Sequence, residues 1–156
     1  MELEDVKKLS LELMESSKAV YLTTIDSKGY PITRAMFNLR NKEQFPEFSN
    51  FYNGLDNKFE IYISTNTSSS KREHIKKNPK ICVYFCDPED FKGVMFGGEV
   101  EVINDMNVKK QIWLDWWTKY YFKGLEDPDY TLLRLRPKMA EFYYRLQKAQ
   151  FNPGEK

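Results

Sequence analysis

A hydroxyl-rich segment followed by basic residues is the part of the chain whose residue types best suit a ligand. It reads Ser64-Thr65-Asn66-Thr67-Ser68-Ser69-Ser70-Lys71-Arg72. The pattern predicts a strand that ends near Thr65, a polar turn, and a short helix that opens with Lys71. The first N–H groups of a helix lack intrahelical partners, and the helix dipole adds partial positive charge there. Hydroxyls, free amides and a lysine suit a phosphate, although an ordinary helix start capped by Ser70 has the same pattern.

A second cation, Arg34, lies inside the predicted strand Ile32-Thr33-Arg34-Ala35-Met36-Phe37. Strand alternation places its side chain on one face with Ile32 and Met36. Burying an unpaired guanidinium among apolar neighbours is costly, so Arg34 needs an anionic partner. A bound phosphate would serve, and so would a structural carboxylate such as Glu60 or Glu99.

Other kinds of site find little support in the sequence. A zinc site would require His74, which is the one histidine, to converge with Cys82, Cys86 and a carboxylate, so we expect no metal. The chain has no GxSxG, GxxxxGK[ST] or GxGxxG motif, which disfavours a serine triad, a P-loop and a dinucleotide fold. No catalytic residue can be named from the sequence. The two cysteines would lie about 13 Å apart on one strand, so we expect free thiols, as is typical of the cytoplasm.

Length and composition set the class of protein. The chain has 156 residues, a net charge of +1 and 15% aromatic residues, which predicts one domain over residues 1–156. Near-neutrality argues against a nucleic-acid partner, and no apolar run approaches the roughly 18 to 20 residues that a membrane span needs. We therefore expect that the protein binds neither nucleic acid nor a membrane. We also expect a cytoplasmic location. The aromatic excess favours strands, interfaces or a flat ligand.

The elements that must position these residues are mostly short strands. We expect strands over residues 19–25, 30–39, 58–65, 81–86, 94–103, 132–136 and 140–145. Helices are expected over 2–16, within an N-terminal segment 1–17, and over 71–78. Six to seven strands that pair with sequence neighbours predict an antiparallel barrel or sandwich with peripheral helices.

Two longer segments carry most of the remaining aromatic residues. Residues 40–57 form a long insert loop, in which the spacing of Phe45, Phe48 and Phe51 favours a packed lid. Residues 105–122 are expected to form one helix capped by Asp105, with its tryptophans on one stripe that faces the core or a dimer interface.

Motifs in a characteristic order extend over nearly the whole chain. They are Asp26-Ser27-Lys28-Gly29-Tyr30-Pro31, Ser70-Lys71 followed by Ile75, Asn78-Pro79, Val94-Met95-Phe96-Gly97-Gly98-Glu99, Ile112-Trp113, Gly124, Asp127-Pro128-Asp129, Leu132-Leu133 and Pro137-Lys138-Met139-Ala140-Glu141-Phe142-Tyr143. In order and spacing they resemble the pyridoxamine 5′-phosphate oxidase-like FMN-binding split barrels. Within that family the chain is most similar to the bacterial general stress protein subgroup.

The resemblance implies a mainly β fold, an antiparallel split barrel, and a homodimer with FMN at the subunit interface. Arg34 and Lys71 would bind the FMN phosphate, aided by Thr65 and Ser70. The backbone of Ala35, Met36 and Ser64 would edge the isoalloxazine, and Tyr143 would approach the ring from the other subunit.

The implied function is a flavin-dependent oxidoreductase of unknown substrate. The alternative is a non-catalytic FMN-binding or redox-sensing homodimer, and a deazaflavin could replace FMN. The chain departs from the oxidases where it has Ser70 for a second basic residue, Leu39 for a lysine and Gly93 for a glutamine. It also keeps only part of their C-terminal substrate motif, at Arg145-Leu146. These departures argue against oxidation of pyridoxine phosphate.

Overall fold

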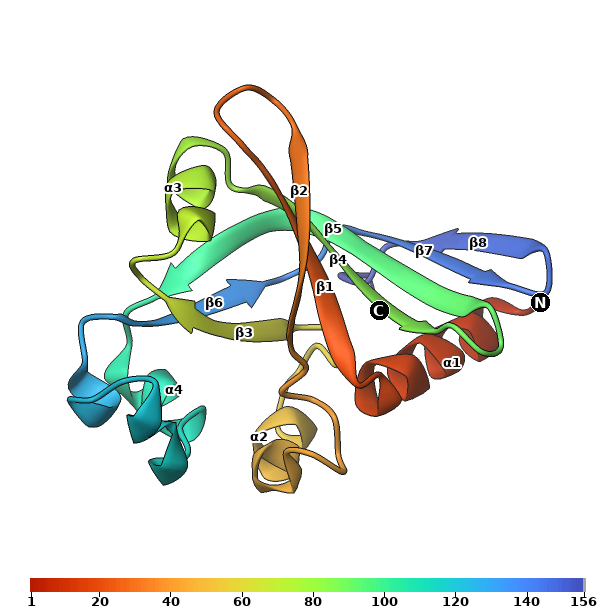
Figure 1. Cartoon of the computed structure of the whole chain (residues 1–156). Coiled ribbons are helices and arrows are strands. Elements are labelled where there is room, and N and C mark those ends of the chain that lie inside the picture. Colours follow the sequence, from red (N-terminus) through yellow and green to blue (C-terminus); the bar gives the residue numbers. More distant parts are fainter. Residues whose placement is uncertain (156) are drawn as a thin grey trace.

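Eight antiparallel strands curl into an open half-barrel in the computed structural model, which describes residues 1–155 (Figure 1). The strand order is β2-β1-β4-β5-β6-β3, with β7 paired to β5 and β8 paired to β7. The strands are β1 (Ala19–Ile25), β2 (Pro31–Phe37), β3 (Ile61–Asn66), β4 (Lys80–Asp87), β5 (Lys92–Ile103), β6 (Tyr130–Leu135), β7 (Met139–Tyr144) and β8 (Gln147–Phe151). This is the split-barrel architecture of the β+α class that the sequence predicts.

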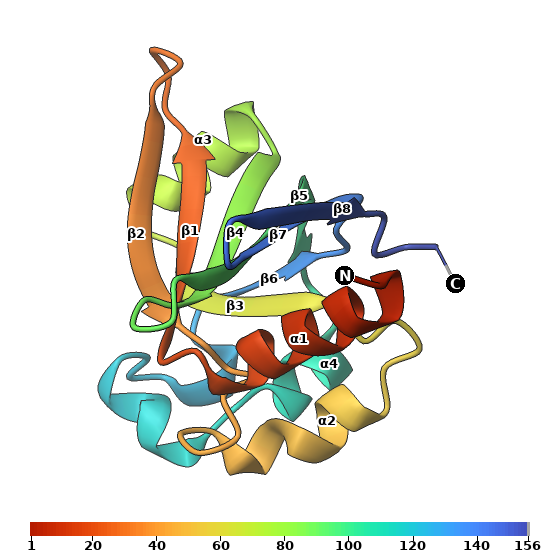
Figure 2. The same ribbon diagram turned by 90° about the vertical axis from the view of Figure 1, so that its right-hand side faces the viewer.

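The helices are short and lie around the sheet, as Figures 1 and 2 show. They are α1 (Leu3–Ser16), α2 (Ser49–Asn53), α3 (Ser70–Lys77) and α4 (Met106–Gln111), with the 3-10 turns η1 (Pro46–Phe48), η2 (Asp115–Lys119) and η3 (Gly124–Glu126). Helix α1 packs against β4, β5 and β8, and α3 packs against β1. Within residues 1–155, no helix has the length and apolar character that a membrane crossing requires.

The expected count of six to seven strands is wrong because the sequence gives no signal for β8. This strand is polar and mostly exposed, so it lacks the alternation that marks a half-buried strand. The turn before it uses Arg145 and Leu146, both with positive φ (49° and 63°), where glycine or asparagine would normally announce a hairpin. Strand β3 starts later than expected because Asn57 accepts hydrogen bonds from the backbone N–H groups of Phe59 and Glu60, which hold a turn there.

The barrel stays open because β5 changes its pairing partners along its length. Its residues 92–99 pair with β4, and residues 93–97 also pair with β7 on the other side. From Val100 onward it pairs with β6 instead. The change of partner follows Gly97 and Gly98, and a side chain at Gly98 would press its Cβ to 3.1 Å from Leu135. The main path of the sheet therefore ends in β2 and β3, which form no hydrogen-bonded ladder with each other, and β8 is a further edge beside β7.

The apolar interior consists of two clusters of buried residues. The first fills the half-barrel between the sheet and α1, and the second lies under the two long segments of the chain. In the second cluster Phe45 and Phe48 from the 40–57 segment meet Trp117 and Tyr121 from the 112–124 segment. The 40–57 segment is therefore packed and ordered, with η1 and α2 inside it.

The single helix expected over residues 105–122 is wrong. Asp105 does cap a helix, since its side chain accepts from Asn107 N at 2.8 Å, but α4 ends at Gln111. Ile112 and Tyr121 are both buried in the second cluster. The two residues are nine positions apart, and the direction of the side chain turns by about 100° per residue in an α-helix. One continuous helix would therefore place them on opposite faces. The chain therefore leaves the helix at Ile112 (φ −108°, ψ 60°) and continues through the 3-10 turn η2.

Truncating Phe48 tests whether the 40–57 segment belongs to the core. Its side chain is 2% exposed and its ring lies 6.0 Å from Phe45 and 5.9 Å from Trp117. We expect Phe48→Ala to lower the free energy of unfolding by about 3 to 5 kcal/mol, measured by denaturant titration. Phe122→Ala, at a site 88% exposed, should change it by less than about 0.5 kcal/mol. Equal small effects would contradict a packed segment.

Candidate functional site

A cavity of about 430 Å³ lies at the split between β2 and β3, which we call the split cavity. Its volume is within the range of roughly 300 to 1,000 Å³ that small-ligand pockets occupy. Strand β2 and the neighbouring start of β1 form one wall, β3 and α3 form another, and the 112–124 segment forms the third. The lining residues are Lys18, Ala19, Ala35, Met36, Phe37, Ser64, Thr65, Asn66, Lys71, Trp117, Tyr120 and Tyr121.

Lys71 lines this cavity, and a second cation, Arg34, lies close enough for its charge to act on Lys71, although Arg34 itself is not part of the lining. Lys71 lies in the first turn of α3, and its pKa is lowered first by burial and then by the positive charge of Arg34. Burial also lowers the pKa of Arg34. Among residues 1–155, neither cation forms a salt bridge. Like charges held together without an acid are a typical arrangement for binding an anion.

The alternative of a structural carboxylate for Arg34 is wrong. Both oxygens of Glu60 are already engaged, since Oε1 accepts from Arg136 Nε at 2.9 Å and Oε2 accepts from Tyr62 OH at 2.8 Å. Glu99 is exposed and lies opposite Lys80 in the β4–β5 register. Arg34 is therefore left with uncharged protein partners.

Those partners hold one end of the guanidinium. Arg34 Nη1 donates to Ile32 O at 2.7 Å, to Thr24 Oγ1 at 2.8 Å and to Leu22 O at 3.3 Å. Every hydrogen bond that the guanidinium makes within the described chain leaves from Nη1. The other two nitrogens, Nη2 and Nε, have no hydrogen-bond partner within the described chain. This is the fork geometry with which arginine binds a phosphate or carboxylate.

The start of α3 differs from the expected capping by Ser70. Ser69 is the N-cap residue, with extended backbone (φ −74°, ψ 153°), but its side chain makes no capping hydrogen bond. Its hydroxyl oxygen is buried and has no partner in the described residues, whereas Ser70 is exposed. An unpartnered hydroxyl at a helix N-terminus beside Lys71 fits a phosphate oxygen.

Asp129 fixes the loop between β3 and α3. Its carboxylate accepts from the side chain of Asn66 and from Ser68 N, the latter at 2.8 Å. These bonds, with that of Asn66 first, lower the pKa of Asp129. The carboxylate is thus charged at neutral pH, and the loop loses this support as the pH falls through the lowered pKa. The Asp127-Pro128-Asp129 motif therefore serves to place the hydroxyl-rich segment.

Aromatic side chains close the third wall, and sequence reasoning missed them as site residues. Trp117, Tyr120 and Tyr121 come from the 112–124 segment, and the ring of Tyr120 lies 6.3 Å from that of Phe37 on β2. The high number of aromatic residues in the sequence did indicate a flat ligand. However, the single helix expected over residues 105–122 gave no reason to place these three side chains at the split. A wall of rings beside two cations suits a flat heterocycle that carries a phosphate.

Five of the eight predicted site residues line the split cavity, and they are Ala35, Met36, Ser64, Thr65 and Lys71. Arg34 lies beside Lys71, as the effect of its charge on that residue's pKa indicates. Ser70 and Tyr143 do not line the cavity, and Tyr143 lies on β7 opposite Gly93 of β5. The space that a side chain at Gly93 would need is filled by the hydroxyl of Tyr84.

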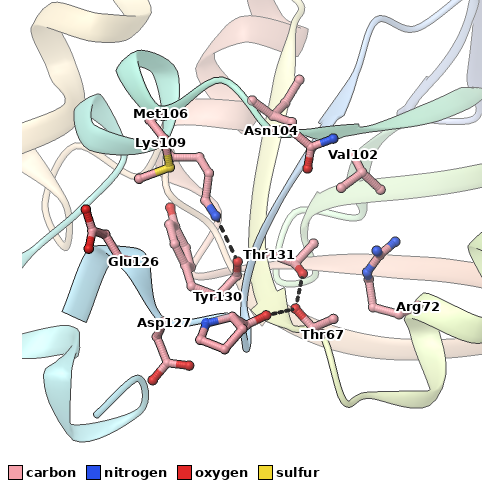
Figure 3. Close-up of a pocket in the computed structure, with 12 residues that line it drawn as sticks. Thr67, Arg72, Val102, Asn104, Met106, Lys109, Glu126, Asp127, Tyr130 and Thr131 are labelled. Atoms are coloured by element: carbon pink, nitrogen blue, oxygen red, sulfur yellow. Dashed lines mark hydrogen bonds between the residues drawn. The ribbon is translucent and has the colours of Figure 1, made fainter. Parts of the chain in front are cut away.

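A second pocket, of about 440 Å³, is less suited to an anion (Figure 3). It carries Arg72 and Lys109, but Glu126 and Asp127 bring opposite charge to its lining. Its polar groups are largely engaged, since Lys109 Nζ donates to Tyr130 O at 3.1 Å and the hydroxyls of Thr67 and Thr131 are hydrogen-bonded to each other. Over residues 1–155, histidine, cysteine and acidic side chains form no group of three or more that could hold a metal ion.

The fold agrees with comparison to known families. Residues 6–144 match the family model described as pyridoxamine 5′-phosphate oxidase. The chain therefore belongs to the pyridoxamine 5′-phosphate oxidase family. No curated protein matches the sequence.

Among solved structures, a Clostridium acetobutylicum protein described as related to general stress protein 26 of B. subtilis, in the pyridoxinephosphate oxidase family, is similar over nearly its full length. It is 35% identical, with a TM-score of 0.76, and the match covers 96% of this chain and 95% of that chain. General stress protein 26 from Bacillus anthracis shares the fold at 17% identity, with a TM-score of 0.69 and coverages of 93% and 98%. A heme binding protein from Mycobacterium smegmatis also shares the fold, at 14% identity with a TM-score of 0.65, over 92% of this chain and 57% of that chain.

Replacing Lys71 with methionine tests the cation pair, because it keeps the side-chain length and removes the charge. A lysine whose folded pKa is lowered destabilises the fold at all pH values below that pKa, and the penalty is lost as the pH rises through it. We therefore expect Lys71→Met to raise the free energy of unfolding in anion-free buffer at neutral pH. The gain should shrink at about pH 10, close to the ordinary pKa of lysine.

The matched control is Lys76→Met, an exposed position on the same helix. Inorganic phosphate should raise the melting temperature of the wild type and of Lys76→Met, but not that of Lys71→Met. Equal behaviour of the two variants would contradict an anion site at Lys71.

Proposed function

We propose that the chain binds FMN in the split cavity and works as a flavin-dependent oxidoreductase on a small substrate. The observation that carries the proposal is the convergence of Arg34 and Lys71 without an acidic partner in the described chain. Membership of the pyridoxamine 5′-phosphate oxidase family supports the same conclusion. The related Clostridium protein, at 35% identity, supports a place in the general stress protein subgroup.

The residues present fit FMN part by part. The phosphate would be bound by Nη2 and Nε of Arg34, by Lys71, and by the hydroxyls of Ser69 and Thr65. The backbone of Ala35, Met36 and Ser64 would edge the isoalloxazine, and the aromatic wall would exclude water from it. When bound, the flavin supplies the electron-transfer chemistry, and the protein orients it and keeps its surroundings dry.

A homodimer is part of the proposal, since four large aromatic or apolar side chains are exposed on one face of the sheet. The register places Tyr21 directly opposite Tyr84, and Phe37 and Met139 lie on this same outer face. All four are exposed in the single chain. An apolar patch of this kind typically marks a protein interface. Tyr143 lies on the same face. In such a dimer, the Tyr143 side chain of one subunit would therefore approach the ligand of the other.

Light scattering of the purified chain tests the dimer. We expect a molar mass twice that of one chain, and Tyr21→Glu should reduce it to the mass of one chain because a carboxylate would be buried in an apolar interface. Lys148→Glu, on the exposed β8, should leave the mass unchanged. A wild-type chain that is monomeric at high concentration would contradict the dimer.

A non-catalytic FMN-binding or redox-sensing protein is the second candidate. It is favoured by the titratable groups of the split cavity, which are Lys18, Lys71, Tyr120 and Tyr121. Burial, and then the charges of Asp129 and Asp127, raise the pKa of Tyr121 to about 12. Tyr121 is therefore not a ready acid or base near neutral pH. The two free cysteines, Cys82 and Cys86, support a cytoplasmic location for either candidate.

Other cofactors find less support. A deazaflavin with a phosphate tail could use the same cation pair. Haem is disfavoured, because His74 is hydrogen-bonded to Thr24 and does not line the split cavity. Arg145 lies in the exposed turn before β8 and stacks on Tyr144 at 4.8 Å, so it does not supply a substrate-phosphate site within this subunit.

The visible spectrum of the purified protein, before and after titration with FMN, tests the proposal. We expect bound flavin in the wild type. The double variant Arg34→Ala/Lys71→Ala should bind at least about a hundredfold more weakly, since each charge-assisted contact contributes about 1.5 to 3 kcal/mol. Arg145→Ala/Lys148→Ala removes the same charge from an exposed hairpin and should bind like the wild type. A wild-type chain with no affinity for FMN would refute the proposal.

Turnover separates the two candidates. An oxidoreductase should accelerate NAD(P)H-driven reduction of its bound FMN beyond the rate of free FMN. A binding or sensing protein should hold FMN with no such acceleration.

A further inference from the structure

We propose that Thr24 and His74 form a positioning relay that sets Arg34 for the anion in the split cavity. The proposal rests on the proposed function, because it concerns how that site holds its phosphate. It follows from two consecutive hydrogen bonds that join three elements of the fold.

The two bonds share one buried hydroxyl. Arg34 Nη1 on β2 donates to Thr24 Oγ1 on β1 at 2.8 Å, and the same oxygen lies 2.8 Å from His74 Nδ1 on α3. The side chain of Thr24 is completely buried, at 0% exposure. A hydroxyl at such a position needs partners for both its proton and its lone pairs, and these two bonds supply them.

The chemistry of the groups fixes the direction of the relay. A guanidinium can only donate, so Thr24 Oγ1 is the acceptor in its bond with Arg34. The proton of the hydroxyl is then free to be donated to His74 Nδ1. In the arrangement that we propose, the imidazole accepts this proton at Nδ1. The imidazole then orients the hydroxyl, and the hydroxyl helps to orient Arg34 Nη1 together with the backbone oxygens of Ile32 and Leu22.

The relay also links the two cations of the site. His74 lies three residues after Lys71, which places the two side chains on neighbouring parts of one helix face. Arg34 and Lys71 repel each other when no anion lies between them, and β2 and β3 form no ladder that would oppose their separation. The bonds through Thr24 tie β2 to α3 across β1. They hold the cation pair at a fixed spacing before the ligand arrives.

This preorganisation of Arg34 should affect only the affinity that a ligand gains through its phosphate group. Nη1 is the anchored nitrogen, which leaves Nη2 and Nε as the nitrogens that could bind a phosphate oxygen. Loss of the Thr24 bond leaves Nη1 with the backbone oxygens of Ile32 and Leu22 alone, so the guanidinium is held less firmly and binding must restore part of its orientation. A ligand with the same ring but no phosphate should not be sensitive to this loss.

Titrations of FMN and riboflavin against paired variants test the relay. Thr24→Val removes the hydroxyl at nearly constant volume, and Thr24→Ser keeps it. We expect Thr24→Val to weaken FMN binding about five- to tenfold, the effect of about one hydrogen bond, and to leave riboflavin binding unchanged. Thr24→Ser should bind both ligands like the wild type.

A second pair at His74 gives the same test if Thr24→Val does not fold. His74→Asn keeps an acceptor near the position of Nδ1, whereas His74→Leu removes it. We expect His74→Leu to weaken FMN binding by about the same factor as Thr24→Val, and His74→Asn to restore most of it. Unchanged FMN affinity in the hydroxyl-free and acceptor-free variants would overturn the relay. So would an equal loss for riboflavin, which would indicate a purely structural role.

Melting temperatures in inorganic phosphate separate failure of the relay from failure of the proposed function. If the wild type does not bind FMN but is stabilised by phosphate, the proposed function fails, and the same variants then test the relay with phosphate as the probe. Smaller phosphate-induced shifts in Thr24→Val and His74→Leu than in Thr24→Ser and His74→Asn would support it. A wild type that binds neither ligand would overturn both proposals.

Discussion

The missing ladder between β2 and β3 is the constraint on which the rest of the structure depends. These strands are the two ends of the main path of the sheet, and pairing them would close the barrel and remove the split cavity. They stay apart because β5 pairs with β4 and β7 in its first part and with β6 in its last part. Each edge keeps backbone N–H and C=O groups that no neighbouring strand uses. In this fold Ala35, Met36 and Ser64, which lie on the two unpaired edges, line the split cavity.

The charges at the split show a compromise between stability and binding. Arg34 and Lys71 are both partly buried, and burial lowers the pKa of each. A fold selected for stability alone would place an acid between them or keep them apart. Instead, the uncharged oxygens around Arg34 Nη1 hold the guanidinium without neutralising it. The second pocket differs in this respect, because Glu126 and Asp127 lie beside its basic residues. Its charge therefore favours an anion less.

Local sequence patterns predicted the elements that carry the basic and hydroxyl residues of the candidate site. The hydroxyl-rich segment, Arg34 within its strand and Lys71 at a helix start depend on alternation and helix-start signals, which act over a few residues. The aromatic wall depends on distant contacts. Ile112, Trp117 and Tyr121 must reach one core, and this requirement overrides a helical pattern that is locally reasonable. Thr24 and His74 are fifty residues apart. No periodicity connects them, so their hydrogen bond could be found only in three dimensions.

The aromatic segment beside the split has a further consequence for spectroscopy. All three tryptophans of the chain, Trp113, Trp116 and Trp117, lie within it. The indole of Trp117 lines the split cavity and contacts the other two edge-on, at ring distances of 5.9 and 6.2 Å. The intrinsic fluorescence of the protein therefore originates at one place, next to the candidate site. An absorbing ligand there would quench the emission of the whole chain, so the molecule carries its own optical reporter of occupancy.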